Sequence, residues 1–598
     1  MKMISRHGLL LGTASVMLTA GSMYGCKDFL ASAAQPQGIL NEQTLANKAG
    51  VEGTLIAAYR TVDCTNATAS NWGCAASNWV WSDVASDDSY KGSNATDQPP
   101  INDIEAYHWG TADAESYLNN KWRAVYEGVV RANSTLRLLK EVEKGSPGAI
   151  SASDAASIEG EAVFLRAFYH FEAWRMWGNI PYYRENDVDF QKANLNSADV
   201  VTEITKDLDT AIAQLPATPR NGEKGRVTSW TAKAYKGRLQ AYTGQWAAAL
   251  TTLRDIQANG PYALEQSFDR VWTGFHDFSN GKETIFAYQA SANDGEPNAA
   301  NSNYGDRLNF PYSGSHFGCC GFNQPTQNLV NFFRVDANGL PLALSNPSGW
   351  NASDSNFNSS NLAPVDPRLD YTVGRDGVPY KDWGIYSVAA GWVRDPSNGG
   401  PYSPKKNVHE KASGAESTVG WAPAQTNSVK IHLFRYADLL LLLAEAEVEA
   451  GSLENARAIV NQIRARAGVT AQGTGVDRAH IAVPINDPSI TWAVYKVGLY
   501  QTPFASQSDA RDAVRAERRL ELAMEGQRMF DLRRWGLEAQ VLNAYVNGVG
   551  GGAEKTRRNY LAAAEPVTSR HDLYPIPTIQ ISLSQVNGQN RLKQNPGW

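Results

Sequence analysis

Two segments of this chain share one spacing of small and large residues, and that spacing restricts the fold more than any other feature. The segments are centred on Gly244 and on Gly451. Relative to the first glycine, Gly237 lies seven residues before it, and Trp246, Ala249, Leu253 and Pro261 lie two, five, nine and seventeen residues after it. The same places around the second glycine hold Ala444, Leu453, Ala456, Val460 and Gly468. Small residues here let two antiparallel helices approach closely, and a glycine permits the tight turn between them. The spacing therefore predicts two helix hairpins.

This spacing is the pattern of a tetratricopeptide repeat, matched at five places in the first segment and at four in the second. Stacked helix pairs bury a continuous core only when several of them follow one another. We therefore expect other helices of the chain to be divergent members of the same stack. The alternative, an ordinary antiparallel hairpin with a glycine turn, leaves the helical frame unchanged.

Apolar residues recur at helical spacing in two groups of segments. They are 51–59, 122–139, 157–177, 201–215 and 229–257 in the first group, and 434–467 and 513–535 in the second. Between the groups the periodicity fails, and Gly, Pro, Asn and Ser are frequent. We expect an all-α, mainly helical fold, in which a tetratricopeptide-like frame of helix pairs carries long loop-rich insertions with short β elements. The expected parts are a frame at about 41–60, 121–260 and 430–540, insertions at about 62–120 and 262–430, and a C-terminal extended segment at 570–598.

The charge balance limits the kinds of partner. The chain has 598 residues, of which 55 are basic and 61 acidic, so the formal net charge is −6. Without a basic excess there is little to displace the counterions of a phosphate backbone, so a nucleic acid partner is disfavoured. Hydrophobic residues make up 42% and charged residues 19%, which excludes a chain that is mostly disordered or mostly embedded in a membrane.

The first 25 residues have the features of a targeting segment. Lys2 and Arg6 precede a short apolar stretch at 8–21, and small residues follow before Cys26. We predict a signal peptide at 1–25 and a single domain at 26–598. The surroundings of Cys26 resemble a bacterial lipobox, although Tyr24 is bulky for one, and this predicts a lipid anchor at Cys26. A soluble secreted protein is the alternative. No later apolar run approaches the about 20 residues that a membrane helix needs.

Export permits disulfides, and four cysteines follow Cys26. Cys64 and Cys74 enclose a short loop and are the favoured pair. Cys319 and Cys320 are adjacent, so they either bond to each other, bond to separate partners or stay reduced. Neither pair has the Cys-x-x-Cys spacing of a zinc site, and we predict no metal ligands here.

Motifs of catalysis are missing from the sequence. It has no His-Glu-x-x-His zinc helix, no Gly-x-Ser-x-Gly elbow and no phosphate loop ending in Gly-Lys-Ser or Gly-Lys-Thr. Asp83, Asp87 and Asp88 offer oxygens to a structural calcium ion but lack the regular ligand spacing, and a solvated acidic loop is the favoured interpretation. We therefore predict no cofactor and no enzymatic activity. A pair of carboxylates at the right separation would still make a secreted polysaccharide hydrolase, which is the alternative.

Aromatic residues are numerous, with 17 Trp, 25 Tyr and 18 Phe, and many lie in the two insertions. Indole and phenol rings cover the apolar face of a sugar ring, while Asn, Asp and Arg bind its hydroxyl groups. We therefore expect the insertions to bind a sugar. The candidate residues are Trp79, Trp81, Asp88, Tyr304, Arg307, Asn309, Tyr312, Phe317 and Trp350, with Trp383 as a further one.

Six motifs in order resemble the SusD/RagB family of outer-membrane nutrient-binding lipoproteins. They are CKDFL at 26–30; EAVFLRAFYHF at 161–171 with WGNIP at 177–181; GRVT at 225–228; FRYADLL at 434–440; ERRLELAMEG at 517–526 with RMFDLRRW at 528–535; and YPIP at 574–577 with LKQNPGW at 592–598. Together they span nearly the whole mature chain. The acids and arginines of the fifth motif lie at helical intervals, which predicts structural ion pairs rather than a catalytic or phosphate site.

The resemblance implies a surface-exposed lipoprotein of the cell outer membrane, lipid-anchored and facing outward. Such a protein binds a glycan or oligosaccharide nutrient and delivers it to a partner TonB-dependent transporter of the SusC-like kind. Members of the family also take up peptides, so a peptide-binding uptake lipoprotein is a second hypothesis. A third is a repeat scaffold that binds only proteins through its aromatic loops.

Overall fold

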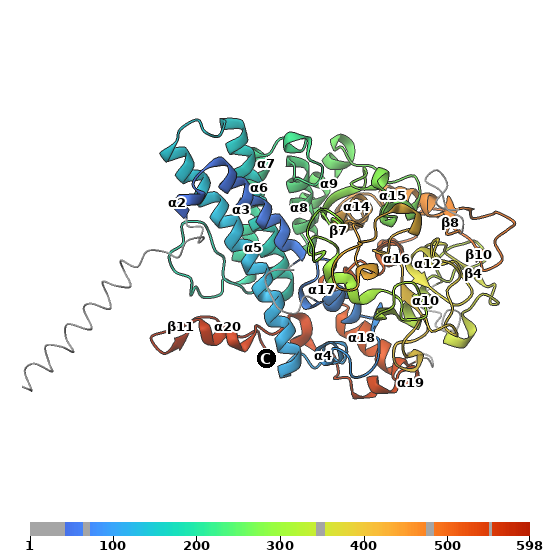
Figure 1. Cartoon of the computed structure of the whole chain (residues 1–598). Helices are drawn as coiled ribbons and strands as arrows, with labels where there is room; N and C mark the ends of the chain where they lie inside the picture. The colour runs from blue at the N-terminus through green and yellow to red at the C-terminus, as the bar shows by residue number, and fades with distance from the viewer. Residues whose placement is uncertain (1–41, 64–71, 343–352, 474–482, 549–552) are drawn as a thin grey trace, which may run out of the picture.

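The computed structural model describes residues 42–63, 72–342, 353–473, 483–548 and 553–598. The predicted signal peptide and three of the residues named above, Cys26, Cys64 and Trp350, lie outside these ranges. Helices dominate the described chain, and its strands form only two-stranded pairs. The fold is therefore mainly helical with a tetratricopeptide-like frame, as the spacing of apolar residues predicts (Figure 1).

The first part of the frame is a stack of long helices packed side by side (Figure 1). It consists of α3 (Lys48–Arg60), α5 (Ala112–Gly145), α6 (Ala152–Trp177) and α7 (Ser197–Gln214). Polar side chains cap the helix starts: the Thr111 hydroxyl accepts from the backbone N–H of Ala114, and the Ser151 hydroxyl accepts from that of Asp154. Each cap satisfies a backbone donor that the helix itself leaves unpaired. α5 begins inside the first expected insertion, so the frame is longer there than predicted.

The two predicted hairpins are present as helix pairs. They are α8 (Ser229–Tyr242) with α9 (Trp246–Asn259), and α14 (Tyr436–Ala450) with α15 (Leu453–Ala467). A Cβ atom added to Gly237 would lie 2.5 Å from Leu253 Cδ2, so the glycine lets α8 and α9 approach closely. Ala444 and Ala456 are fully buried in the second pair. α14 also packs against α9, which joins two pairs that are far apart in the sequence.

Other helices and strand pairs complete, connect and cover this frame. The remaining helices are α2 (Glu42–Leu45), α4 (Pro99–Glu105), α10 (Gln327–Phe332), α12 (Arg368–Thr372), α13 (Pro396–Gly399), α16 (Gln507–Leu522), α17 (Arg528–Arg534), α18 (Glu538–Asn547), α19 (Glu554–Arg557) and α20 (Thr578–Leu583). Within the described ranges, none of the helices is long and apolar enough to span a membrane.

The strands form six pairs, and three of them hold distant parts of the chain together. The pairs are β1 (Ser89–Gly92) with β3 (Phe322–Pro325), β2 (Thr284–Tyr288) with β7 (Ile431–Arg435), β4 (Pro364–Val365) with β10 (Val494–Tyr495), β5 (Val373–Gly374) with β6 (Ser403–Pro404), β8 (Thr470–Ala471) with β9 (Val483–Pro484), and β11 (Gln585–Val586) with β12 (Gln589–Asn590). Only β4–β10 is parallel. In β1–β3, Tyr90 lies opposite Gln324, so this pair joins the first insertion to the second.

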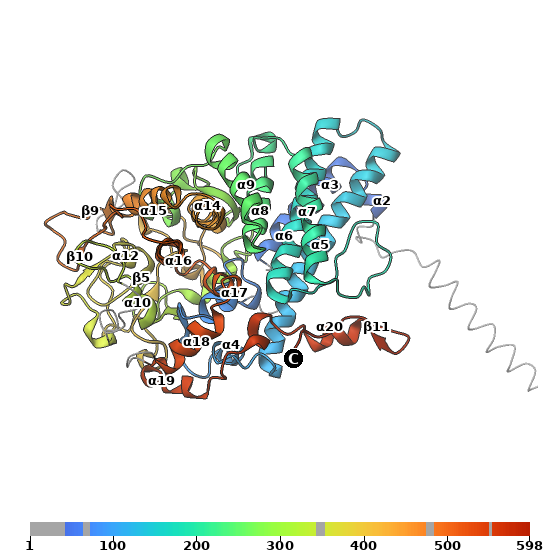
Figure 2. The same ribbon diagram turned by 180° about the vertical axis from the view of Figure 1, so that it is seen from behind.

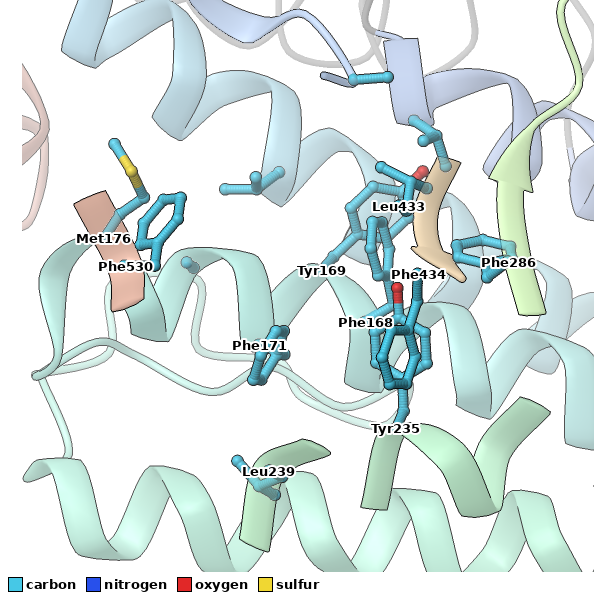
Figure 3. Packing of buried hydrophobic residues seen from close by; sticks show 14 of the residues in the cluster. Phe168, Tyr169, Phe171, Met176, Tyr235, Leu239, Phe286, Leu433, Phe434 and Phe530 are labelled. Carbon is cyan, nitrogen blue, oxygen red and sulfur yellow. The ribbon is translucent and has the colours of Figure 1, made fainter. Parts of the chain in front are cut away.

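An aromatic core lies between α6, α8 and the β2–β7 pair (Figure 3). The ring centroid of Phe168 lies 5.9 Å from that of Tyr235 and 5.2 Å from that of Phe286, in edge-to-face geometry. Phe434 meets Tyr235 in the same way at 5.5 Å. Edge-to-face contacts are favourable because the positive edge of one ring meets the negative face of the other. The second and fourth family motifs thus supply core residues.

The fifth motif forms a buried ion-pair network on α16. Arg368 Nη1 donates to Glu517 Oε1 at 2.6 Å and to Glu521 Oε2 at 3.0 Å. Arg435 Nη1 donates to Glu521 Oε1 at 2.7 Å, and its Nε donates to Glu525 Oε2 at 2.7 Å. Charge-assisted hydrogen bonds of this kind compensate buried charges. The prediction that this motif is structural is confirmed.

The C-terminal segment contains more regular structure than the extended chain that was expected. Helix α20 and the β11–β12 hairpin interrupt it, and Figure 2 shows α20 and β11 running out from the lower side of the frame. The prolines of the YPIP motif fix extended backbone only where they occur. There the Tyr574 hydroxyl donates to the carbonyl of Trp81 at 2.7 Å, and Trp177 Nε1 donates to the carbonyl of Pro575 at 3.0 Å. The motif therefore fastens the tail to the frame.

Candidate functional site

Trp79 and Trp81 lie in the core, on the π-helical turn η3 (Trp79–Val84). Both residues have an exposed fraction of 0%. Trp79 Nε1 donates to the carbonyl of Gly305 at 3.2 Å, and Trp81 Nε1 donates to that of Gly73. This burial corrects the expectation that the two rings contact a ligand, because their surfaces and N–H groups are already used to pack the core and join the insertions.

Asp88 belongs to a buried ion-pair cluster instead of a ligand site. Its Oδ1 accepts from Arg519 Nε at 3.0 Å, and the neighbouring Asp87 accepts from Arg528 Nε at 2.7 Å. Burial alone would raise the pKa of Asp87, but Arg519 and Arg528 overcome it and lower that pKa to about 2. Asp83 accepts a backbone N–H at 2.9 Å. These contacts correct both the ligand role of Asp88 and the expected solvated loop. Among the residues that the structure covers, no group of three or more His, Cys, Asp or Glu side chains is arranged to hold a metal ion.

Trp72, Tyr304, Arg307 and Trp421 come together as one aromatic platform. The rings of Trp72 and Tyr304 are stacked, with centroids 5.9 Å apart and planes 9° apart. Arg307 Cζ lies 3.8 Å from the ring centroid of Trp421, 4.6 Å from that of Tyr304 and 5.0 Å from that of Trp72. Its Nη1 donates to the Tyr304 hydroxyl at 3.1 Å. The guanidinium therefore joins three rings, and the outermost, Trp421, is 70% exposed.

Buried polar side chains hold the loops that carry this platform. Asp63 accepts from the backbone N–H of Gly305 at 3.0 Å and of Ala76 at 2.9 Å, which ties the Trp72 loop to the 3₁₀ helix η7 (Tyr304–Asn309). Burial raises the pKa of Asp63 to about 6. The N–H of Asn303 donates to the carbonyl of Asn427 at 3.1 Å, and the N–H of Asn427 donates to Asn303 Oδ1 at 2.8 Å. The loop that contains Trp421 is thereby anchored beside η7.

The other candidates of the second insertion contact residues outside the platform. Asn309 is buried, and its amide donates to a buried carboxylate at 3.3 Å. Phe317 is buried against Trp383, with ring centroids 5.0 Å apart. Tyr312 is half-buried beside a guanidinium group 5.3 Å from its ring centroid. The burial of Asn309 and Phe317 corrects their expected role as ligand contacts, and Trp350 lies outside the described residues.

The candidates predicted from the sequence include neither Trp72 nor Trp421. The available signal for Trp421 is its position between Gly420 and Pro423, a context typical of a turn. A large apolar side chain in such a turn has few neighbours to bury it. Only the folded chain shows that residues 72, 304–307 and 421 meet.

The three described cysteines of the insertions, Cys74, Cys319 and Cys320, are disulfide-bonded. Cys319 and Cys320 are bonded to each other, which decides between the three alternatives left by the sequence. Cys74 is also disulfide-bonded. Its pairing with Cys64 stays a prediction, because Cys64 is not among the described residues.

Family models match both halves of the chain. One described as "SusD family" matches residues 282–598, which is more than half of the sequence. The chain belongs to the SusD family. A second model, described as "Starch-binding associating with outer membrane", matches residues 51–240 of this SusD-family protein. The two matches together include most of the helical frame, most of the second insertion and the C-terminal tail, and they leave out residues 241–281 with helix α9.

Individual SusD-like proteins are similar over most of their length. SusD-like protein P25 of Formosa agariphila is 24% identical over 436 residues, which cover 71% of each chain. A solved structure of a laminarin-binding SusD-like protein has a TM-score of 0.63 at 22% identity and covers 92% of this chain and 100% of its own. Surface glycan-binding protein A of Bacteroides thetaiotaomicron, solved in complex with laminarihexaose, has a TM-score of 0.64 at 18% identity. The match covers 92% of this chain and 99% of that protein's chain. At these identities the solved structures establish the shared fold.

Proposed function

We propose that this chain is a surface-exposed, lipid-anchored protein of the outer membrane that binds a glycan or oligosaccharide nutrient and delivers it to a partner TonB-dependent transporter. The observation that carries the proposal is the aromatic platform of Trp72, Tyr304, Arg307 and Trp421. SusD-like proteins that are named for laminarin binding, or solved with laminarihexaose, support it.

The platform has the shape and chemistry that a sugar ring needs. The exposed indole of Trp421 presents a flat apolar surface, and the half-buried, parallel Trp72–Tyr304 pair packs beside the same guanidinium. When the C–H face of a pyranose covers such a ring, each Å² of apolar surface removed from water contributes about 25 cal/mol. The backbone anchors at Asp63 and Asn427 keep the rings in place before the ligand arrives, which lowers the cost of ordering them.

The proposed role is binding without catalysis. A glycoside hydrolase needs one carboxyl group as an acid and a second as a base or nucleophile near the sugar. Glu517 and Glu521 of the fifth motif and Asp88 of the first insertion are buried and paired with arginines. They are therefore structural. The alternative of a secreted polysaccharide hydrolase predicts release of reducing ends from a bound polysaccharide by the purified protein.

The location and the transporter partner rest on the sequence and on the family. The lipobox-like surroundings of Cys26 and the order of the six motifs support a lipid anchor at the outward face of the outer membrane. The family description "associating with outer membrane" supports the same location. Delivery to a SusC-like transporter follows from the resemblance.

Affinity electrophoresis of the purified chain against a panel of polysaccharides and of peptide-conjugated matrices tests the binding step. We expect migration to slow in gels that contain at least one polysaccharide and not in those that contain peptides. Retardation by peptides alone would favour the peptide-uptake hypothesis. Retardation by neither would contradict the proposal and favour a scaffold that binds only proteins.

A further inference from the structure

Arg307 is a nearly buried cation without an acidic partner. Its exposed fraction is 2%, and its Nε is buried without a hydrogen-bond partner. Within the described chain, Arg307 forms one hydrogen bond, to the Tyr304 hydroxyl. None of the described carboxylates forms an ion pair with it. Other buried arginines differ: Arg368 and Arg435 each pair with two or more carboxylates. The positive charge of the platform is therefore uncompensated.

The buried acids at η7, Asp63 and Asp306, do not supply a negative charge to Arg307. Asp63 accepts two backbone N–H groups, and burial raises its pKa to about 6. Asp306 accepts from the Ser77 hydroxyl at 2.5 Å, and burial raises its pKa to about 7, so it is only partly ionised at neutral pH. Both carboxyl groups are thus engaged by other donors. Desolvation also lowers the pKa of Arg307 itself, with no carboxylate acting against it.

The position of this cation connects it to ligand binding. Arg307 Cζ lies 3.8 Å from the centre of the Trp421 ring, whose other face is open to solvent. A sugar stacked on that face lies about 3.5–4 Å from the indole. The guanidinium then lies about 7–8 Å from the sugar, within about one Debye length at physiological ionic strength, so it attracts an anionic group there in a salt-dependent way. An acidic substituent on the sugar gains this attraction, and a neutral sugar does not.

We propose that Arg307 makes the platform selective for acidic glycans, in which the sugars carry uronic acid carboxylates or sulfate esters. The inference rests on the proposed function, since it concerns the same platform. The chain as a whole carries a net charge of −6, so most of the protein surface repels an acidic polymer. At the platform, Arg307 attracts it.

The test compares three polymers and three forms of the full chain. Alginate supplies carboxylates, carrageenan supplies sulfates, and laminarin is neutral. Dissociation constants for oligosaccharides of each are measured with the unmodified protein, with Arg307→Met, which removes the charge, and with Arg307→Lys, which keeps it. Arg307→Met also loosens Trp421, so the informative quantity is the ratio of acidic to neutral affinity and not either value alone.

We expect the unmodified chain to prefer alginate or carrageenan oligosaccharides over laminarin by about tenfold or more, and to lose this preference as salt is raised. Arg307→Met should bring the ratio close to one, while Arg307→Lys should keep most of it. A preference for laminarin, or an equal loss of all three affinities in Arg307→Met, would overturn the inference and leave the proposed function standing. No binding to any of the three would count against both.

Discussion

Glu521 is a single carboxylate that three arginines share. It accepts from Arg435 Nη1 at 2.7 Å and Arg368 Nη1 at 3.0 Å, and it also accepts from Arg466. Burial alone would raise its pKa, but the three guanidinium groups overcome burial and hold the pKa of Glu521 far below its usual 4.5. A carboxylate with a lowered pKa in the folded state stabilises the fold above its unfolded pKa. That contribution is lost as the pH falls from about 4.5 through the folded-state pKa.

We therefore predict that Glu521→Gln lowers the free energy of unfolding by about 3–5 kcal/mol, because it leaves buried arginines without compensation. Urea unfolding at pH 7 measures this. Glu449→Gln, which breaks a part-exposed pair with Arg511, is the matched control and should cost at most about 1 kcal/mol. Between pH 5 and pH 3, stability should also fall less steeply in Glu521→Gln than in the unmodified chain. If Glu521→Gln and Glu449→Gln lowered the free energy of unfolding equally, the stabilising role of the buried ion-pair network would be contradicted.

Residues of one type have opposite roles in this chain, and that limits prediction from sequence. Trp79 and Trp421 both lie in regions without helical periodicity, yet the first has no exposed surface and the second is mostly exposed. Burial there depends on contacts between residues that are hundreds of positions apart, such as Trp79 with Gly305. The sequence therefore predicts Tyr304 and Arg307 as candidates but gives no means to separate them from Asn309.

The turn between α16 and α17 packs closely against the first insertion. Gly526 has φ +68°, and a Cβ atom added to it would lie 1.8 Å from the carbonyl oxygen of Ser77. Its N–H donates to Asp83 Oδ1 at 2.9 Å. The turn of the second half of the frame thus lies directly against the first insertion, and only glycine fits there.

Gly526→Ala is accordingly expected to destabilise the fold by about 2 kcal/mol or more, since it adds a clash with backbone to the strain of a positive φ. Gly222 has a similar φ of +69°, and a Cβ atom added there meets nothing within 4 Å. Gly222→Ala should therefore show the strain alone, at about 1 kcal/mol. Thermal unfolding of both variants measures the difference. If Gly526→Ala were at least as stable as Gly222→Ala, the close contact between Gly526 and the Ser77 carbonyl would be contradicted.

Elements with a regular period were predictable, and elements made by distant pairing were not. The α8–α9 and α14–α15 pairs follow from apolar spacing and from the repeat, because a helix satisfies its own backbone. The strands of the insertions are short. The sequence predicts a β-like run at 284–289, where β2 forms, but it gives no means to predict that Thr284 pairs with Arg435. For the same reason the β1–β3 pair, which joins the two insertions, has no local signal.

At the scale of the whole molecule, a helical frame holds two insertions together so that one surface contains residues from three separate regions. The frame was predictable because family motifs and periodicity both describe it. The platform combines the regions around Trp72, Tyr304 and Trp421, which no local pattern connects. The proposed function thus depends on the part of the molecule about which the sequence says least.

The affinity of the Trp421→Ala chain for a retained glycan tests the central claim most directly. Isothermal titration with an oligosaccharide of that glycan should show binding about tenfold weaker or more, equivalent to about 1.4 kcal/mol, because the exposed stacking surface is removed. Phe190→Ala is the matched control, since Phe190 is equally exposed (74%) but lies on the loop before α7. We expect Phe190→Ala to bind like the unmodified chain. Unchanged affinity in Trp421→Ala, or an equal loss in both variants, would contradict the claim that the platform binds the glycan.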